Sequence, residues 1–282
     1  MTALITADGL LHEIDEKDLL VLDVQYTLTG DGPRLYTGGH VPGAPFVDLD
    51  TVLAGPAGEG GRHPLPDVET LQAGLRAAGL DDDSRVVVYD QGTSLGAARA
   101  WWVLRWAGVE DVRVLDGGLA AWRAAGGTVV TEPVSPEPGT VHLEADQLVA
   151  LDAEDAVATA KLGVLVDARS PERYRGEEEP IDPVAGHIPG AVNVPMSDLV
   201  QPDGRLRPAD ELRERFARED IDEVTVVGTY CGSGITAAHT ALALHEAGVD
   251  ADVYIGSWSE WITDPSRPIA TGACPLPSSC PR

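Results

Sequence analysis

The sequence repeats itself, and this duplication constrains the fold more than any other feature. The pentapeptide HVPGA at positions 40–44 returns as HIPGA at positions 187–191. The run LVLD precedes the first copy, and VLVD precedes the second. Each copy closes on a cluster of glycine and tryptophan, DGGLAAW at 116–122 and GSWSEW at 256–261. Self-similarity of this kind, in the same order along both halves, predicts two copies of one domain.

The length of the chain fits this duplication. Its 282 residues provide about 140 for each copy, enough for a domain with a hydrophobic core of its own. Proline recurs between the copies, where large apolar residues are scarce, and such a stretch favours an extended linker. We therefore predict an N-terminal domain at 1–132, a linker at 133–139 and a C-terminal domain at 140–282. The last part of the chain, from about residue 270, is expected to be a flexible tail.

Short β-branched runs alternate with helical patterns inside each copy. In the first copy, the runs at 86–89 and 112–115 alternate with helical patterns at 68–78 and 95–107. This order predicts βα units around a parallel sheet. Because the strand runs are continuously apolar, helices are expected to cover both faces of the sheet. The predicted fold class is therefore α/β, with two tandem domains that each hold a parallel sheet between helices.

The charge balance narrows the range of partners. Asp and Glu number 46 against 20 Lys and Arg, which gives a formal net charge of −26. Such a surface repels phosphate backbones and anionic membranes, so neither nucleic acid nor a membrane is an expected partner. The N-terminus lacks the pattern of a signal peptide, and no stretch reaches the roughly 18 apolar residues of a membrane span, so we expect a soluble, cytoplasmic protein. An anionic substrate would need a few well-placed cations, and isolated arginines in glycine-rich surroundings are the candidates.

The cysteines are too few and too unevenly placed for a disulfide framework. The sequence contains Cys231, Cys274 and Cys280. The last two could pair in a loose tail that is rich in proline and serine. Neither domain is therefore expected to need a disulfide or a metal in order to fold.

Cys231 stands where a strand is expected to meet a helix. An apolar run at 224–229 leads directly into YCGSGIT at 230–236, and a helical pattern begins at once. In an open α/β sheet, ligands bind in the crevice beyond the strand ends. A cysteine at the head of a helix faces unpaired backbone N–H groups and the positive end of the helix dipole, and both stabilise the nucleophilic thiolate. Gly232 and Gly234 would allow the backbone to curl around the sulfur.

Cys231 has a simpler interpretation as a small buried hydrophobe, which is common for a lone cysteine. The flanking glycines, the expected helix start and the duplicated context favour a nucleophile at the centre of an anion cradle instead. The matching loop of the first copy, DQGTSLG at 90–96, has Gln91 at the cysteine position when the offset is 140. Only the second domain is therefore predicted to carry out chemistry.

The chain as a whole resembles the rhodanese superfamily, and specifically its tandem members, the thiosulfate and 3-mercaptopyruvate sulfurtransferases. The resemblance rests on both His-[Val/Ile]-Pro-Gly-Ala boxes, the proline-rich linker, the first copy without a cysteine and the CGSGIT loop at 231–236. It implies that Cys231 cycles between thiolate and persulfide. It also implies a set of substrate-binding residues in the loop: Gly232, Ser233, Gly234, Ile235 and Thr236.

The resemblance also defines the expected partners. The donor is a small anion that carries the sulfur to be transferred. The acceptor is a thiol, cyanide or a thioredoxin-like protein. No cofactor and no metal is implied.

The donor is the least determined part of this hypothesis. Loops that begin Cys-Gly-Ser-Gly resemble the mercaptopyruvate type, and neutral N–H groups hold the doubly charged thiosulfate less well than a cationic loop would. Arg173 matches by position an arginine that holds substrate in the family, and arginine suits a bidentate contact with a carboxylate. A second arginine is usual after a Glu-Pro pair, where this chain has Ile181. Arg175 could substitute for it, and thiosulfate stays the alternative donor.

Mercaptopyruvate enzymes also contain a Ser, His and Asp relay that polarises the substrate. Ser233 matches the serine of this relay and His40 matches the histidine. Asp31 is the nearest acid to the expected place of the third member. The alternative is that His40, like its counterpart His187, only pins the following Pro-Gly turn by hydrogen bonding.

Two other classes of function compete with a sulfurtransferase. A cysteine phosphatase places an arginine six residues after its cysteine, and this chain has Ala237 there. Without that guanidinium nothing clamps a phosphoryl group, whose transfer depends on electrostatic stabilisation. A noncatalytic module that carries sulfur or binds a partner through the same fold is the second competitor.

Overall fold

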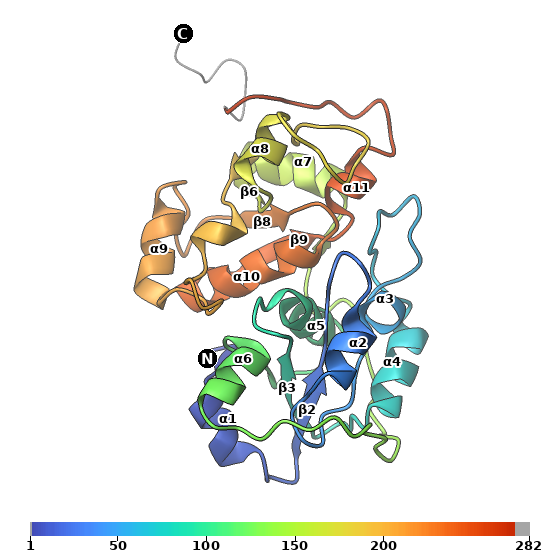
Figure 1. Cartoon of the computed structure of the whole chain (residues 1–282). Helices are drawn as coiled ribbons and strands as arrows, with labels where there is room; N and C mark the ends of the chain where they lie inside the picture. The colour runs from blue at the N-terminus through green and yellow to red at the C-terminus, as the bar shows by residue number, and fades with distance from the viewer. Residues whose placement is uncertain (1, 274–282) are drawn as a thin grey trace. The chain divides into compact units, whose positions relative to one another are not determined.

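The computed structural model describes residues 2–273 and divides into two compact units (Figure 1). Unit 1 contains residues 2–55, Leu65–Leu148 and Gln201–Leu206, and unit 2 contains Pro56–Pro64, Val149–Val200 and residues 207–273. Each half of the chain therefore lends a short segment to the other unit, which the linear division at 133–139 did not foresee. Cys274 and Cys280 lie outside the described residues. None of the described helices is long and apolar enough to cross a bilayer.

Unit 1 is built around a parallel four-stranded sheet in the order β1-β4-β3-β2. Its strands are β1 Leu4–Ile5, β2 Leu19–Asp23, β3 Arg85–Tyr89 and β4 Val112–Leu115. Its helices are α1 Ala7–Glu13, α2 Gly32–Thr37, α3 Leu49–Val52, α4 Val68–Ala77, α5 Leu95–Trp106 and α6 Gly118–Ala124. The strands and helices predicted for the first copy are confirmed, with helix ends shifted by one residue.

Unit 2 repeats this plan with one strand more, in the parallel order β5-β9-β8-β6-β7. Its strands are β5 Ala150–Leu151, β6 Val164–Asp167, β7 Val192–Asn193, β8 Val227–Tyr230 and β9 Ala251–Tyr254. Its helices are α7 Ala153–Leu162, α8 Pro171–Arg175, the 3-10 turn η1 Met196–Asp198, α9 Ala209–Ala217, α10 Ile235–Ala247 and α11 Ser257–Trp261. The prediction of two tandem α/β domains, each with a parallel sheet, is confirmed.

The alternation of side chains along the strands explains why helices cover both faces. In β3, Val87 and Tyr89 join a buried cluster with Leu10 of α1 and Leu119 of α6. Val86 and Val88 point to the opposite face, because successive strand residues alternate, and α5 packs there on β3 and β4. All of these strand residues are buried. A strand covered on both sides must be apolar at every position, as the sequence showed.

One strand of unit 2 begins later than predicted. The apolar run at 224–229 suggested a strand from its first residue, but β8 begins at Val227. Val224 is 89% exposed and Val226 is 60% exposed, because only Val227–Tyr230 pairs with the neighbouring strands. The strand also runs one residue further, so that it ends directly before Cys231.

Candidate active site

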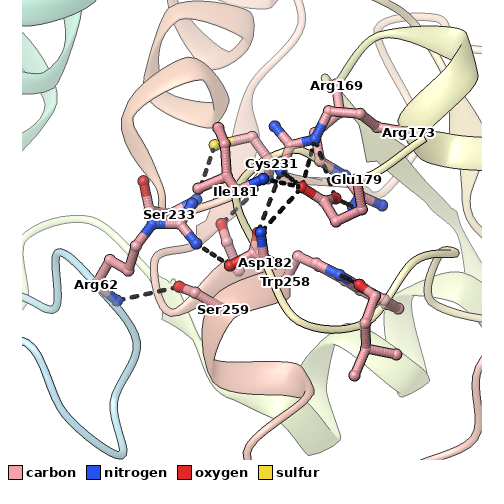
Figure 2. A network of polar contacts seen from close by, with 12 residues as sticks. Arg62, Arg169, Arg173, Glu179, Ile181, Asp182, Cys231, Ser233, Trp258 and Ser259 are labelled. Atoms are coloured by element: carbon pink, nitrogen blue, oxygen red, sulfur yellow. Dashed lines mark hydrogen bonds and ion pairs between the residues drawn. The ribbon is translucent and has the colours of Figure 1, made fainter. Parts of the chain in front are cut away.

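Cys231 occupies the turn between β8 and α10, and its sulfur is held by backbone N–H groups (Figure 2). The Sγ atom accepts hydrogen bonds from the Ser233 N–H at 3.4 Å and the Gly234 N–H at 3.2 Å. Gly234 has a φ of 81° and caps α10, a left-handed conformation that glycine adopts without strain. The chain therefore curls around the sulfur, and N–H dipoles that point at Sγ favour a negative charge on it.

The turn is fixed from its other side by the start of α11. The Ser257 hydroxyl accepts a hydrogen bond from the Cys231 N–H at 3.1 Å and donates one to the Tyr254 carbonyl at 2.8 Å. The carbonyl of Cys231 accepts from the Trp258 N–H at 3.0 Å, and that of Gly232 accepts from the Ser259 N–H at 3.0 Å. The protein's own contacts thus fix the cradle, the backbone N–H groups of Ser233 and Gly234 around Sγ. The reaction is therefore spared the cost of ordering these groups.

Arg173 of α8 lies beside this turn. A methyl group placed on Gly232 would be 3.4 Å from Arg173 Nη2 and 3.5 Å from Nη1. The guanidinium is aimed by Glu179, which accepts from Nε at 3.0 Å and from Nη2 at 2.7 Å. The structure therefore places Arg173, which the sequence analysis selected, beside Gly232, the residue after the cysteine.

A second arginine, Arg62, approaches the same residue, and the sequence reasoning missed it. It belongs to the Pro56–Pro64 segment of unit 2, and its Nη2 would lie 2.9 Å from a methyl group on Gly232. Its backbone N–H donates to the Ser259 hydroxyl at 3.0 Å (Figure 2). Arg62 stands 169 positions before Cys231, in the other half of the chain. One sequence feature could have identified Arg62 as a candidate. In GEGGR at 58–62 it is an isolated arginine among glycines.

Two carboxylates accompany the two arginines. Asp182 forms ion pairs with Arg62 and with Arg173, the latter at 3.1 Å. Burial raises the pKa of Asp182, although both arginines oppose this shift. Burial acts in the same direction on Glu179, but the hydrogen bonds from Arg173 and from the backbone of Ile181 and Asp182 prevail and lower its pKa. Glu179 is therefore the fixed anion of the pair, and Asp182 is the one that takes up a proton more easily.

A buried ion pair helps to hold these arginines and carboxylates in place. Arg169 donates to Asp167 through Nε at 3.0 Å and Nη2 at 2.6 Å, and both side chains are fully buried. Its Nη1 lies 3.4 Å from Glu179, and its guanidinium lies 4.7 Å from the centre of the Trp258 ring. Arg169 thus helps to hold Glu179, which in turn aims Arg173.

The position expected for a second family arginine is not filled by a cation. Ile181 is 41% exposed, and only its backbone N–H takes part in the network, with a bond to Glu179 at 3.2 Å. Arg175 was suggested as its substitute, but its guanidinium pairs with Glu177 at 2.8 Å and Glu172 at 3.4 Å on the surface. The structure gives that suggestion no support, because no hydrogen bond or ion pair joins Arg175 to the Cys231 loop within the described part of the chain.

His40 is fully buried in unit 1 and matches His187 of unit 2 in its surroundings. Each ring stacks on a tyrosine, Tyr36 or Tyr174, with centroids 3.9 and 3.8 Å apart. Nδ1 of each lies within hydrogen-bond distance of the same tyrosine's carbonyl, at 3.1 and 2.7 Å. Asp31 lies elsewhere in unit 1, bound to Thr29 and Arg34, and within residues 2–273 no hydrogen bond joins it to His40. A relay through these two residues stays a prediction.

Ser233, Ile235 and Thr236 complete the predicted loop. Ser233 is 5% exposed, and its hydroxyl has no hydrogen-bond partner among the described residues. Ile235 and Thr236 form the first turn of α10, whose N–H groups lack partners inside the helix. The exchanged segment Pro56–Pro64 adds one more group that the sequence reasoning did not select, the partly buried imidazole of His63.

The arrangement can store negative charge on a sulfur atom and bind a small carboxylate next to it. A cysteine whose sulfur accepts N–H groups can act as a nucleophile, and two guanidinium groups beside the next residue can bind a small anion. The arginine of a phosphatase loop is absent, since position 237 is a fully buried alanine of α10.

Comparison with known proteins agrees with this geometry. The family model of the rhodanese-like domain matches residues 6–125 and 144–264. A relative from Pseudomonas aeruginosa, provisionally named 3-mercaptopyruvate sulfurtransferase, is 48% identical over 95% of this chain and 98% of that protein. A relative from Mycobacterium tuberculosis, provisionally named thiosulfate sulfurtransferase SseB, is 47% identical over 95% of this chain and 97% of that protein. The crystal structure of the 3-mercaptopyruvate sulfotransferase SseA from Escherichia coli is similar with a TM-score of 0.81 and 32% identity, covering 92% of this chain and 100% of that one.

Proposed function

This chain belongs to the rhodanese-like domain family, and we propose that it is a sulfurtransferase that moves sulfur from 3-mercaptopyruvate to an acceptor through a persulfide on Cys231. The observation that carries the proposal is the position of Sγ, which accepts N–H groups from Ser233 and Gly234 at the head of α10. Relatives that are named as sulfurtransferases are similar in sequence to this chain over nearly its whole length.

The chemistry follows from the cradle. The Cys231 thiolate attacks the sulfur of mercaptopyruvate, so that a sulfur–sulfur bond forms and the carbon–sulfur bond breaks. The electron pair of the broken bond passes to the carbon of the donor as an enolate, which takes the proton of the donor's thiol and leaves as pyruvate. The persulfide keeps one negative charge, so the same N–H groups that stabilise the thiolate stabilise the product of the first step. An acceptor thiolate or cyanide then attacks the outer sulfur and releases the Cys231 thiolate.

The charges beside the loop favour mercaptopyruvate over thiosulfate. Two guanidinium groups, of Arg62 and Arg173, meet two carboxylates, of Asp182 and Glu179, so the surroundings of Gly232 carry no net positive charge. A donor with one carboxylate is compatible with this balance, and a compact dianion is less so. Thiosulfate stays the second candidate, because several of the relatives are named for it.

Two measurements test this proposal. The specificity constant for mercaptopyruvate should exceed that for thiosulfate by about tenfold or more, as one unfavourable charge contact of about 1.4 kcal/mol would cause. The mass of protein exposed to donor alone should rise by one sulfur atom, and adding an acceptor should remove it. Activity without such an adduct would contradict the persulfide, and a preference for thiosulfate would contradict the donor.

Ser233 offers a sharper test of the donor's chemistry. We propose that its hydroxyl donates to the keto oxygen of mercaptopyruvate, where negative charge develops as the enolate forms. Ser233→Ala should then lower turnover with mercaptopyruvate and leave thiosulfate nearly unaffected, because thiosulfate has no carbonyl. An equal loss with both donors would mean that Ser233 acts on the cradle alone.

The identity of the histidine in the relay is a separate question. His40 is proposed from its match to the family, with Asp31 as its partner, whereas His63 has the advantage of lying next to Arg62 in a segment of unit 2. His40→Asn, His63→Asn and the matched control His187→Asn separate the two. A loss of turnover in His63→Asn with normal turnover in His40→Asn would assign the role to His63, and the reverse result would assign it to His40.

The acceptor is proposed by class. A persulfide sulfur is electrophilic towards thiolates and cyanide, so a small thiol, cyanide or a thioredoxin-like protein could accept it. Initial rates with each acceptor at saturating donor rank them directly, and ping-pong kinetics are expected because the donor's product leaves before the acceptor reacts.

A further inference from the structure

We propose that Arg62 is a donor-binding residue that replaces the family arginine missing at Ile181, and that Asp182, shared between Arg62 and Arg173, makes this site selective for donors with a single negative charge. The inference rests on the proposed function and adds a residue and a selectivity rule to it.

The position of Arg62 is the first support. Its Nη2 is nearer to the methyl position on Gly232 than either Nη atom of Arg173, at 2.9 Å against 3.4 and 3.5 Å. Two independent anchors hold it there, the backbone bond to Ser259 and the ion pair with Asp182. An anion bound next to Cys231 would therefore face two guanidinium groups that come from distant parts of the sequence (Figure 2).

The second support is the unequal hold on the two carboxylates. Glu179 is bound by Arg173, by Arg169 and by two backbone N–H groups, so it stays in place as an anion. Asp182 is held by the two arginines that face Gly232, through one oxygen each. Its carboxylate thus occupies the same guanidinium groups that a donor carboxylate would use.

The consequence is a site whose charge is set in advance. With Asp182 present, the two arginines and two acids sum to zero, and a monoanionic donor adds one negative charge. A dianion adds two to the same small, largely buried volume, where unit charges interact several times more strongly than in water. Selectivity against dianions therefore comes from Asp182 and not from a steric barrier.

The test measures anion binding directly, so that it does not depend on turnover. In a Cys231→Ser background, the dissociation constants of pyruvate and of sulfate are measured by titration calorimetry for Arg62→Met, Arg62→Lys and Asp182→Asn. Arg175→Met and Glu177→Gln are the matched controls, because that arginine and acid pair with each other on the surface. The same substitutions with Cys231 intact are assayed for persulfide formation with both donors under single-turnover conditions.

Arg62→Met should weaken pyruvate binding about tenfold to thirtyfold, as loss of one charge-assisted hydrogen bond would, and Arg62→Lys should restore part of it. Asp182→Asn should tighten sulfate binding about tenfold more than pyruvate binding. With Cys231 intact, the donor concentration that gives the half-maximal rate of persulfide formation should rise in Arg62→Met by about the same factor as the dissociation constant of pyruvate. Both controls should stay within about twofold in every measurement.

Two outcomes would overturn the inference. Pyruvate binding within twofold of the parent in Arg62→Met would show that Arg62 only packs against the loop. Equal changes for pyruvate and sulfate in Asp182→Asn would show that Asp182 positions the arginines without setting the charge. Failure of the proposed function gives a different result, in which the unmodified protein forms no persulfide while the binding effects of Arg62 and Asp182 remain.

Discussion

The two units present the same cradle with different contents. Tyr89 and Tyr230 end equivalent strands, and each hydroxyl accepts the N–H that follows the histidine of its own His-x-Pro-Gly-Ala box, at 2.9 and 3.1 Å. The next residue is Asp90 in unit 1 and Cys231 in unit 2. Asp90 fills its cradle with its own carboxylate, which accepts the N–H groups of three loop residues at 2.8 to 3.1 Å. The duplicated loop therefore directs backbone N–H groups at one side chain in both units, a carboxyl group in unit 1 and the sulfur of Cys231 in unit 2.

This comparison corrects the alignment made from sequence. The offset between the units is 141 at the strand ends, and it becomes 140 at the helix starts, Leu95 and Ile235. The loop of unit 1 is therefore one residue longer, and Gln91 was placed at the cysteine position because an offset of 140 was carried across that insertion. Asp90, not Gln91, is the counterpart of Cys231.

The residues beside the loop also differ between the two units. Tyr36 and Tyr174 are equivalent, since each stacks on its histidine and donates to the alanine carbonyl that closes the box. The residue before them is Leu35 in unit 1 and Arg173 in unit 2. Unit 1 thus has no cation at the position where unit 2 aims one at the loop. Conversion of one unit into the other would need more than the cysteine.

The largest effect should come from replacing Cys231, including by aspartate, the residue that stands at its position in unit 1. Cys231→Asp and Cys231→Ser should both abolish sulfur transfer with every donor, because neither side chain can carry a persulfide. Cys231→Asp should still fold, since Asp90 shows that a carboxylate is accommodated among the N–H groups of such a loop. Turnover is measured with both donors, and folding is followed by hydrogen exchange of the loop. Residual turnover well above background in either variant would remove Cys231 as the nucleophile.

The second prediction concerns the aspartates that end β2 and β6. Asp167 is paired with buried Arg169, whereas Asp23 of unit 1 is buried near Gln25 and Tyr89, and no arginine among residues 2–273 forms an ion pair with it. Asp167→Asn should destabilise unit 2 by about 3 kcal/mol or more, because it leaves the Arg169 charge buried without its main partner. Hydrogen exchange and urea unfolding of each unit measure the change, and an unaltered stability of unit 2 would show that Glu179 suffices for Arg169.

Asp23→Asn should have the opposite effect, because it should raise the stability of unit 1 at neutral and higher pH. Burial raises the pKa of Asp23 to about 7, above its value in the unfolded chain of about 3.9. The folded state therefore binds more protons between these values, so the stability of unit 1 is highest below about pH 4, falls as the pH rises to about 7 and is level above it. Asp23→Asn should abolish this slope and stabilise unit 1 at pH 8 by up to about 4 kcal/mol. A slope that persists in the variant would assign the titration to another group.

The sequence predicted the architecture well because its signals are local. Apolar runs such as 86–89, the two boxes and the glycine-rich cysteine loop each report on their own segment, and the fold followed from their order. The exchange of segments could not be predicted in this way. Arg62 reaches the loop because of contacts between Pro56–Pro64 and the start of α11, and nothing in the nearby sequence encodes a partner almost 170 positions away. The role of Asp182 was hidden for the same reason, since it depends on both arginines at once.

The smallest expected effect compares Gly118 with Ser257, the residues that begin the last helix of each unit. Both have a left-handed backbone, with φ of 53° and 54°, which glycine adopts freely and serine does not. The serine is retained in unit 2 at the cost of about 1 kcal/mol or more of backbone strain, and its hydroxyl accepts the N–H of Cys231 at 3.1 Å. That contact has no counterpart in a glycine, so the strain serves the cradle of unit 2.

Ser257→Gly should therefore separate stability from activity. The glycine relieves the strain but leaves the buried Cys231 N–H without its acceptor, two contributions of about 1 kcal/mol each that nearly cancel, so the melting temperature should change by only a few degrees. The rate of persulfide formation should fall by about threefold to tenfold, because the loop loses one of the contacts that fix it. Gly118→Ser in unit 1 is the matched control: its new Cβ would lie 2.4 Å from the Asp90 carbonyl, so it should lower the stability of unit 1 and leave persulfide formation unchanged. An unchanged rate in Ser257→Gly would mean that the bonds from Trp258 and Ser259 alone hold the catalytic turn.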